Sequence, residues 1–480
     1  MDRNQSALQE LRFIMGLETH AQLKTKSKLF CNCINSVYAN DLPPNTAICD
    51  VCLGMPGTKP RLNKKAVEIV LKIALALNCK INKEFFFSRK TYFYPDLAKN
   101  YQITQYEIPV GVKGYVKIHV NNKEKIIRIK RVHIEEDPAK IIHRKDYVLV
   151  DYNRSGVPLV EIVTEPDFNT PEEIRAYLNK IMQILEYIDA FDSSKGTFKS
   201  DLNISIEGIG ERVEVKNITG IKEVEIAANY EIIRQKNIIL RGGRIERETR
   251  RWDESKNITL SMRKKETEED YGYIFEPDLP SIIISDEEID TIKQSLPELP
   301  DVKIERLMRE YNINRKLAES LASEKEIADL FERCVKREGI SIKNASTWVG
   351  VVLRKILNYN NLLYRNSGVK DEWIIDVIKW YEEEKYNDYN TEMIMRKIFE
   401  DVLPPEEIIK KYGFKEKIRD ESLREIVKKV IEKYPNAVQD YHSGKEKALE
   451  FLVGMVLKET KGSADPKLAR KILLEILRNK

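Results

Sequence analysis

The spacing of apolar residues changes near residue 295, and this change divides the chain into two kinds of secondary structure. Before it, short segments alternate apolar and polar residues between glycine-containing turns, which indicates a largely antiparallel sheet. Two amphipathic helices lie among these segments. Asn63 can cap one that runs to about Asn78, and TPEE at 170–173 begins the other with an N-cap, an N1 proline and a capping-box glutamate. After LPELP at 296–300, only helical periodicity follows.

These patterns predict an α+β fold with a mainly antiparallel sheet, followed by an all-α part. We assign residues 1–295 to the α+β domain, residues 296–405 to a helical domain and residues 406–480 to a small, basic helical tail domain. The second boundary falls at VLPPEE, where Pro404 and Pro405 interrupt the helical pattern. A chain of 480 residues is long enough for two or three domains, each with its own core.

Charge and hydropathy restrict the class of protein. The formal net charge is only +4, so any contact with nucleic acid must come from local patches rather than from a global basic field. No run of about 18 apolar residues occurs, which predicts no membrane contact. The first residues, MDRNQSALQELRF, lack the apolar core of a signal peptide. We therefore expect a cytoplasmic protein, in which clustered cysteines favour metal over disulfides.

Four of the six cysteines lie within the short segment 29–57. A C-x-C pair and a C-x2-C pair are separated by a loop with two prolines suited to a turn. Four thiolates suit tetrahedral Zn²⁺, and because cysteine fills every position the ion would be structural. The alternative is four buried thiols that bind no ion. The predicted zinc ligands of this insertion are Cys31, Cys33, Cys49 and Cys52, while Cys79, on the apolar face of the first helix, and Cys334 are assigned to packing.

Polar residues share one face on each of four expected strands. In FIMGLETHAQL, alternation places Glu18 and His20 opposite a packed face. The segments RVHIEEDPAK, TFKSDLNISI and ERVEVKNI repeat this arrangement with further acids and with basic residues such as Lys216. Several carboxylates on one sheet face form a typical cradle for Mg²⁺, and a divalent ion among basic residues suits phosphoryl transfer. An ordinary ionic surface is the alternative.

Several common catalytic motifs are absent from the sequence. There is no G-x-x-x-x-G-K-[ST] loop, no G-x-G-x-x-G between a strand and a helix, and no G-x-S-x-G elbow. If ATP is used, it is therefore not bound through a P-loop. With the cysteines assigned to zinc or packing, no obvious nucleophile is left for glutamine hydrolysis.

Two stretches combine features that suit RNA. Residues 88–109 interleave basic and aromatic side chains that can hold an RNA acceptor end by stacking and phosphate contact, although they can equally be core strand residues. The tail segment 442–473 gathers lysines that suit the RNA backbone, with a solvated helical face as the alternative. The predicted tRNA-binding residues are Arg89, Tyr92, Tyr94, Tyr101, Lys445, Lys447, Lys458 and Lys461.

Taken together, these segments resemble one family, the B subunits of the glutamine-dependent aspartyl/glutamyl-tRNA(Asn/Gln) amidotransferases. The resemblance covers the N-terminal domain almost from end to end and the tail. One departure lies in DYGYIFEPD, where Gly272 replaces an arginine of many bacterial members, so a contact assigned to that arginine is in doubt. The matching segments are IMGLETHAQLKTKSKLFC, NTAICDVCLGMPGTKPRLN, RKTYFYPDLAKNYQITQ, RVHIEEDPAK, VDYNRSGVPLVEIVTEPD, SDLNISI, EVKNI, GGRIERETRRWDE, EDYGYIFEPDLP and GKEKALEFLVGMVLKETKG.

The resemblance implies a fold, an activity and partners. The N-terminal domain is expected to be a glutamine-synthetase-like cradle and the tail to be YqeY-like. ATP would phosphorylate the side-chain carboxylate of Asp or Glu on a misacylated tRNA, and ammonia from the amidase A subunit would displace phosphate. A small C subunit would complete a heterotrimer, with ATP, Mg²⁺ and structural Zn²⁺ as cofactors.

Carried across by motif, the site residues fall into two overlapping sets. The expected Mg²⁺ ligands are Glu18, His20, Glu135, Glu136, Asp201 and Glu214. The expected catalytic residues are Glu18, His20, Glu136 and Lys216.

Two rival functions stay open at this point. A non-catalytic, zinc-containing RNA-binding adaptor would keep the cysteines and the tail but would have no use for repeated carboxylate faces. An aminoacyl-tRNA synthetase is disfavoured because the H-I-G-H and K-M-S-K-S signals are absent.

Overall fold

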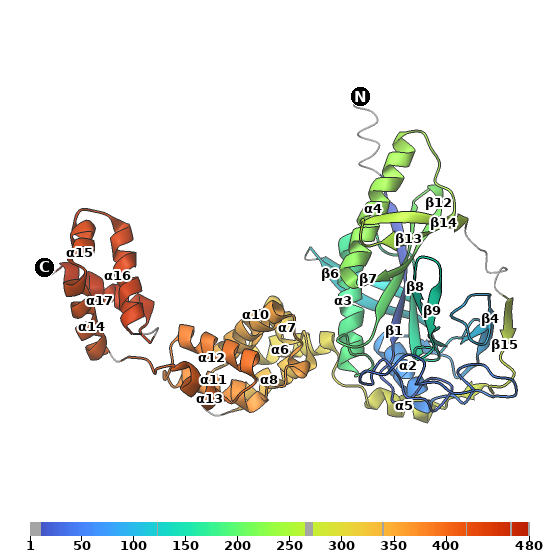
Figure 1. Cartoon of the computed structure of the whole chain (residues 1–480), viewed down its shortest axis with the longest axis horizontal. Helices are drawn as coiled ribbons and strands as arrows, with labels where there is room; N and C mark the ends of the chain where they lie inside the picture. The colour runs from blue at the N-terminus through green and yellow to red at the C-terminus, as the bar shows by residue number, and fades with distance from the viewer. Residues whose placement is uncertain are drawn as a thin grey trace. The chain divides into compact units, whose positions relative to one another are not determined.

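A computed structural model describes residues 11–121, 123–264, 272–337, 340–418, 420–460 and 463–478. The chain divides into two compact units, Met1–Leu299 and Pro300–Lys480, and each is considered by itself (Figure 1). The unit boundary falls within the LPELP segment.

A nine-stranded sheet forms the centre of the first unit, in the order β14-β13-β12-β11-β1-β10-β7-β6-β2. Every neighbouring pair is antiparallel except β12 and β13, which run parallel. The prediction of an α+β fold with a mainly antiparallel sheet is confirmed. The strands are β1 (Phe13–Gln22), β2 (Lys80–Ile81), β6 (Gly111–Val120), β7 (Lys123–Glu136), β10 (Pro158–Thr164), β11 (Phe198–Ile206), β12 (Ile209–Thr219), β13 (Glu248–Asp253) and β14 (Ile258–Lys264).

Three small sheets accompany the large one. They are β15-β4-β5 (Gly272–Phe275, Ser88–Thr91, Tyr101–Thr104), β16-β3 (Ile282–Ile283, Glu84–Phe85) and the hairpin β8-β9 (Lys140–His143, Val148–Asp151). Gly272, which stands where the resemblance expects arginine, pairs with Thr91 at the start of β15.

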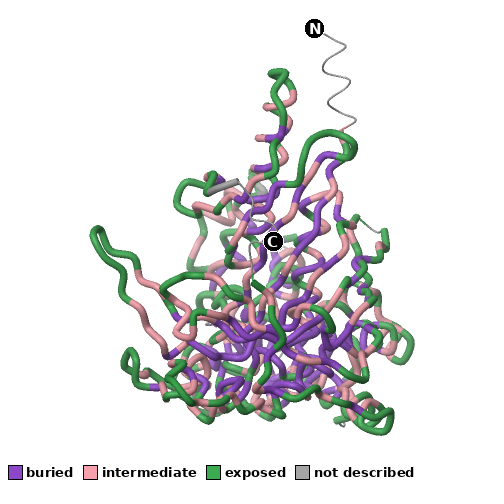
Figure 2. Tube along the Cα trace, turned by 90° about the vertical axis from the view of Figure 1, so that its right-hand side faces the viewer, coloured by how far each residue is buried: buried purple, intermediate pink, exposed green. Residues whose placement is uncertain are grey.

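Helices cover one face of the large sheet. α2 (Lys64–Ala76), α3 (Pro171–Tyr187) and α4 (Ile221–Leu240) contact its strands, and α5 (Asp286–Gln294) contacts α2. The side chains between them and the strands form one continuous core, in which alternate residues of β1 such as Met15 and Leu17 are buried. In Figure 2 the buried residues, in purple, gather toward the interior of the trace, while the exposed residues, in green, lie on the outer turns. Because the helices take one face, the polar residues of the same strands point to the other.

The two helix starts expected from the sequence are present. The Asn63 side chain accepts hydrogen bonds from Lys65 N and Ala66 N, and Thr170 accepts one from Glu173 N. Glu173 does not close a capping box, because its carboxylate accepts the N–H of Asn169 instead. Cys79 is buried as expected but lies beyond the end of α2, next to β2, rather than on the helix face.

The second unit contains only helices among the residues that the structure describes. One apolar cluster lies within residues 304–408 and another within residues 423–477. No helix in the described part of the chain is long and apolar enough to cross a membrane. The helices are α6 (Pro300–Tyr311), α7 (Arg315–Leu321), α8 (Lys325–Lys336), α9 (Ile342–Thr347), the π-helical turn Trp348–Leu353, α10 (Arg354–Asn360), the 3₁₀ turn Tyr364–Asn366, α11 (Asp371–Glu382), α12 (Asp388–Asp401), α13 (Pro405–Tyr412), α14 (Asp420–Lys433), α15 (Pro435–His442), α16 (Glu446–Glu459) and α17 (Pro466–Arg478).

Candidate functional site

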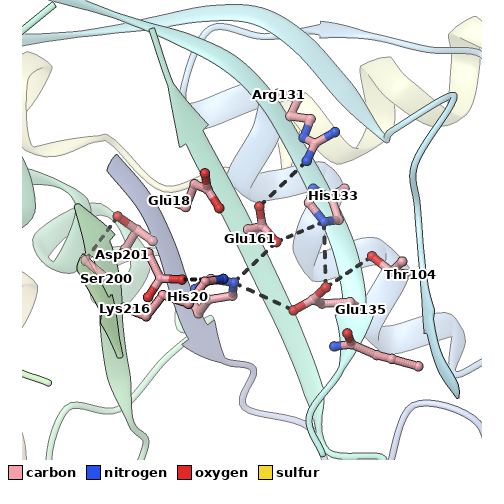
Figure 3. A network of polar contacts seen from close by, with 12 residues as sticks. Glu18, His20, Thr104, Arg131, His133, Glu135, Glu161, Ser200, Asp201 and Lys216 are labelled. Carbon is pink, nitrogen blue, oxygen red and sulfur yellow. Dashed lines mark hydrogen bonds and ion pairs between the residues drawn. The ribbon is translucent and has the colours of Figure 1, made fainter. Parts of the chain in front are cut away.

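Strand pairing gathers acids and histidines on the face of the large sheet opposite the helices (Figure 3). Glu18 on β1 lies opposite Asp201 on β11, and His20 lies opposite Glu161 on β10. His133 on β7 pairs with Glu161 from the other side. The alternation proposed for β1 therefore places Glu18 and His20 on the same face as acids from the two strands that flank β1.

The first group, which we call the His20 cluster, consists of His20, Glu135 and Glu161. One ligand atom from each lies within 4.8 Å of the other two. His20 Nε2 is 3.2 Å from Glu161 Oε2 and 3.7 Å from Glu135 Oε1. His133 Nε2 stands 3.3 Å from Glu161 Oε2, while Thr104 Oγ1 donates to Glu135 Oε2 at 3.1 Å.

The second group, the Glu18 cluster, consists of Glu18, Asp201 and Glu214, again with ligand oxygens within 4.8 Å of one another. Lys216 Nζ lies 3.4 Å from Glu214 Oε1 and 3.8 Å from Asp201 Oδ2, so it partly neutralises the group. Asn203 Nδ2 donates to Glu18 Oε1 at 3.1 Å. Oxygen-rich groups of this kind match the ligands that Mg²⁺ prefers.

The two clusters differ in how their charge is balanced. Burial, followed by the charges of Glu161, Asp201 and Glu214, raises the pKa of Glu18. Burial would lower the pKa of His20, but the hydrogen bond with Glu161 and the charges of Glu161 and Glu135 outweigh it and raise that pKa to about 10. Burial opposes ionisation of Glu161 as well, yet the two imidazoles hold its pKa well below the ordinary value. The excess negative charge therefore lies in the Glu18 cluster, which favours a bound cation there.

Two cavities meet at these clusters and share Glu18, Lys90, Glu135, Glu161 and Lys216 in their walls. The larger has a volume of about 850 Å³ and the smaller about 500 Å³. The larger cavity adds four cations and the tyrosine pair Tyr106 and Tyr273, whose rings stack with centroids 4.1 Å apart. The four cations are Lys130, Arg131, Arg212 and Arg247. The smaller cavity adds Tyr92, Tyr94, Asp137, Arg154 and Lys199.

The larger cavity contains polar groups that the described protein residues leave unsatisfied. Arg131 Nε, His133 Nδ1 and Asn203 Oδ1 are buried and have no hydrogen-bond partner. All three side chains line this cavity. Because leaving a buried polar atom unpaired is costly, their convergence favours a polar ligand at this place.

Glu136 lies apart from both clusters. It follows Glu135 on β7, so its side chain points to the opposite side, where Lys99 Nζ is 2.6 Å from its Oε1. The two residues line a third cavity of about 190 Å³ beside the cysteines. The sequence reasoning also missed Glu161, although its position as the one acid within the apolar run PLVEIVT of β10 was a visible signal.

The aromatic-basic stretch is divided between two cavities. Tyr92 and Tyr94 line the smaller cavity. Arg89 and Tyr101 line the third cavity, where Arg89 binds the buried carboxylate of Glu276 with Nε and Nη2 and its guanidinium lies 4.5 Å from the Tyr101 ring centroid. The stretch therefore does not form one continuous binding surface.

Basic tail residues lie on the surface of the second unit. Lys447 and Lys458 are exposed on α16, and Lys445, also exposed, reaches Asp440 Oδ1 at 2.8 Å. Lys461 lies outside the described residues.

The four clustered cysteines converge, as the spacing predicts. One Sγ from each of Cys31, Cys33, Cys49 and Cys52 lies within 4.8 Å of the others. Such a set of four thiol ligands could hold a zinc ion. Cys334 is fully buried in α8, in agreement with a packing role.

Two different family models match the chain, one in each compact unit. The GatB/GatE catalytic domain matches residues 13–290, which contain both acid clusters, and the GatB domain matches residues 329–477. The fold and the site thus define a protein whose α+β unit is of the GatB/GatE catalytic class.

Full-length relatives specify the family further. The B subunit of the aspartyl/glutamyl-tRNA(Asn/Gln) amidotransferase of Thermotoga maritima is 44% identical over 480 residues, covering 97% of this chain and 99% of its own. The proteins of the same name from Thermoanaerobacter pseudethanolicus and Methanococcoides burtonii are 44% and 43% identical, each covering 97% of this chain and 98% of the relative. The chain belongs to the GatB family, and the resemblance drawn from its motifs is confirmed.

Proposed function

We propose that this chain is the B subunit of a tRNA-dependent amidotransferase, which phosphorylates the side-chain carboxylate of Asp or Glu on a misacylated tRNA and then amidates it. The observation that carries the proposal is the pair of acid clusters between two cavities. A site that transfers a phosphoryl group from a nucleotide to a carboxylate needs room for both reactants, one on either side of the metal ligands.

The larger cavity suits the nucleotide. Its four added cations can bind phosphate oxygens. One of them, Arg131, has a buried Nε–H group without a hydrogen-bond acceptor among the described residues. Mg²⁺ bound at the clusters would neutralise phosphate charge. Glu18, Asp201 and Glu214 would hold one ion and His20, Glu135 and Glu161 a second, and Lys216 would contact the transferred phosphoryl group from the edge of the first set. The raised pKa of Glu18 supports this assignment, because a cation would relieve the repulsion that causes it.

The smaller cavity suits the aminoacyl end of the tRNA. Lys199 lies opposite His20 in the β1–β11 pair and lines the smaller cavity. Among the described residues, no carboxylate lies within 4 Å of its ammonium group. It is therefore available to bind the side-chain carboxylate of the substrate. Tyr92 and Tyr94, in the same wall, offer rings for the terminal base.

The reaction follows in two displacements. A carboxylate oxygen attacks the γ-phosphorus of ATP, forming an O–P bond while the bond to the bridging oxygen of ADP breaks. Ammonia then attacks the acyl carbon, and the C–O bond breaks so that phosphate leaves with the electron pair. The nitrogen loses a proton and the product is Asn-tRNA(Asn) or Gln-tRNA(Gln).

The remaining assignments belong to the same proposal. Ammonia would come from an amidase A subunit, with a small C subunit completing the complex, because the sequence offers no obvious nucleophile for glutamine hydrolysis once the cysteines are assigned to zinc or packing. The cysteines at 29–57 would hold structural Zn²⁺. A division into three domains is supported by the three separate apolar clusters, but Ile408 packs in the second cluster, which moves the boundary expected at 405/406 to a point after α13. Exposed Lys445, Lys447 and Lys458 would contact the tRNA body.

Phosphate release from ATP by the chain assembled with its A and C partners tests the proposal. Release should depend on Asp-tRNA(Asn) or Glu-tRNA(Gln) and should fall at least about 100-fold in Glu161→Gln, which removes a charge from the His20 cluster. Glu207→Gln, on the same sheet but exposed at the β11–β12 turn, is the matched control and should retain activity. If an active complex released no phosphate with either aminoacyl-tRNA, a non-catalytic RNA-binding adaptor would be the better interpretation.

A further inference from the structure

Lys28 is a fully buried lysine with an unusual set of neighbours. Its exposed fraction is 0%, although lysine is rarely buried without an anionic partner. Its Nζ lies 3.6 Å from Cys52 Sγ and 3.2 Å from the carbonyl oxygen of Tyr152. No carboxylate among the described residues forms an ion pair with it within 4 Å. The sulfur of Cys52 is therefore the group that can serve as its counter-charge.

The space around Lys28 is fitted to this position. A Cβ at Gly156 would be in ordinary van der Waals contact, 3.6 Å from Lys28 Cδ and 3.8 Å from Cys52 Cβ, so the backbone of Gly156 packs directly beside both side chains. The backbone is held at the same place, because Leu29 N donates to Gly156 O at 2.8 Å. Ser155 Oγ donates to the carbonyl of Cys52 at 3.3 Å. The segment that precedes β10 thus holds the lysine and the cysteine from one side.

Charge balance gives this contact a function. Four thiolates around one Zn²⁺ carry a net charge of 2 − 4 = −2, which is costly to bury. One ammonium beside a ligating sulfur halves this charge and donates an N–H to the sulfur. Residues that orient a metal ligand in this way commonly contribute about 10–100-fold to metal affinity.

We propose that Lys28 is a positioning residue of the zinc site, which orients the Cys52 sulfur, balances part of the charge of the four ligands and links Cys52 to the Tyr152 carbonyl. The inference concerns the zinc site and does not rest on the proposed amidotransferase reaction. In this proposal the ammonium group of Lys28, rather than a fifth metal ligand, offsets part of the negative charge of the four cysteine ligands.

Zinc affinity of the full chain tests this inference directly. Zn²⁺ itself is the probe, and its affinity is measured by competition with a chromophoric chelator under reducing conditions. Lys28→Met, which keeps the length of the side chain and removes its charge, should weaken Zn²⁺ binding about 10–100-fold. Lys26→Met changes an exposed lysine in the same segment and should leave the affinity unchanged.

A second set of variants separates charge from packing. Co²⁺ bound in place of Zn²⁺ gives an absorption spectrum that reports tetrahedral coordination by four sulfurs. If Lys28→Met loses only the charge balance, its Co²⁺ spectrum should keep the intensity seen in the wild type. Should Lys28→Met fail to fold, Lys28→Gln can still donate a hydrogen bond but carries no charge, and it should show the same loss of affinity. Zinc affinity within twofold of wild type in either folded variant would overturn the proposal and leave Lys28 as a packing residue.

Discussion

Replacing Glu18 by glutamine should make the metal-free protein more stable while removing its response to Mg²⁺. The ligand oxygens of Glu18, Asp201 and Glu214 lie within 4.8 Å of one another. At an effective dielectric constant of about 20, two unit charges at that separation repel by about 3.5 kcal/mol. Lys216 offsets part of this repulsion. Glutamine keeps an oxygen for the hydrogen bond from Asn203 and removes the charge.

Protonation sets an upper limit to the effect. Glu18 can avoid the repulsion by taking up a proton, which at pH 7.5 costs about 4 kcal/mol relative to an unperturbed glutamate. The neutral variant should therefore gain between about 1 and 4 kcal/mol. Because the pKa of Glu18 is raised on folding, the wild type loses stability as pH rises from the unfolded value toward the folded one. The advantage of Glu18→Gln should grow over that range and then level off.

Thermal unfolding of both proteins in EDTA and in Mg²⁺, at pH 6 and pH 8, measures this effect. Each kcal/mol corresponds to a rise in Tm of about 2–4 °C for a domain of roughly this size. Mg²⁺ should raise the Tm of the wild type and leave that of the variant nearly unchanged. Lower stability of Glu18→Gln in EDTA, or an equal response to Mg²⁺, would refute the assignment of excess negative charge to this cluster.

Three further perturbations test other parts of the molecule. Removing zinc with a chelator should lower the Tm of the full chain and expose the four clustered thiols to alkylation, whereas unchanged thiol protection would show that they bind no ion. Glu332, whose pKa is lowered to about 2 by hydrogen bonds from Arg306 and Lys303, stabilises the second unit above its unfolded pKa of about 4.3 and loses that contribution as pH falls toward 2. Glu332→Gln should thus cost about 2–3 kcal/mol in urea unfolding at pH 7 and about half as much at pH 3. Gly114→Ala should destabilise the first unit by about 1–3 kcal/mol in the same assay, because its Cβ would lie 2.4 Å from Cys79 Sγ and 2.5 Å from Leu77 O.

Local patterns predicted those parts of the fold that depend on neighbouring residues. Asn63 and Thr170 cap helices because their side-chain oxygens reach the next backbone N–H groups, a geometry contained within a few residues. The polar face of β1 followed from alternation alone. The same reasoning could not place the carboxylate of Glu173, which accepts hydrogen bonds from Asn169 N and Lys125 Nζ, because Lys125 lies on β7, far from α3 along the chain.

The site residues show where such reasoning ends. Glu135 and Glu136 are adjacent acids at one strand end, and both were expected at the metal. Alternation separates them, so that only Glu135 reaches the His20 cluster while Glu136 pairs with Lys99 on the other side. Applying the period of two strictly to RVHIEED would have kept His133 and Glu135 together and excluded Glu136.

Glu161 illustrates the information that a single strand lacks. An acid within PLVEIVT is 8% exposed, and burying an unpaired carboxylate there would be prohibitive. Its burial is tolerated because β1 supplies His20 at 3.2 Å and β7 supplies His133 at 3.3 Å and Arg131 at 3.9 Å. These partners are 28 to 141 residues away along the chain, and only the order β1-β10-β7 and its register bring them together. A lone acid in an apolar strand therefore indicates that neighbouring strands must present cations, although the sequence does not say which ones.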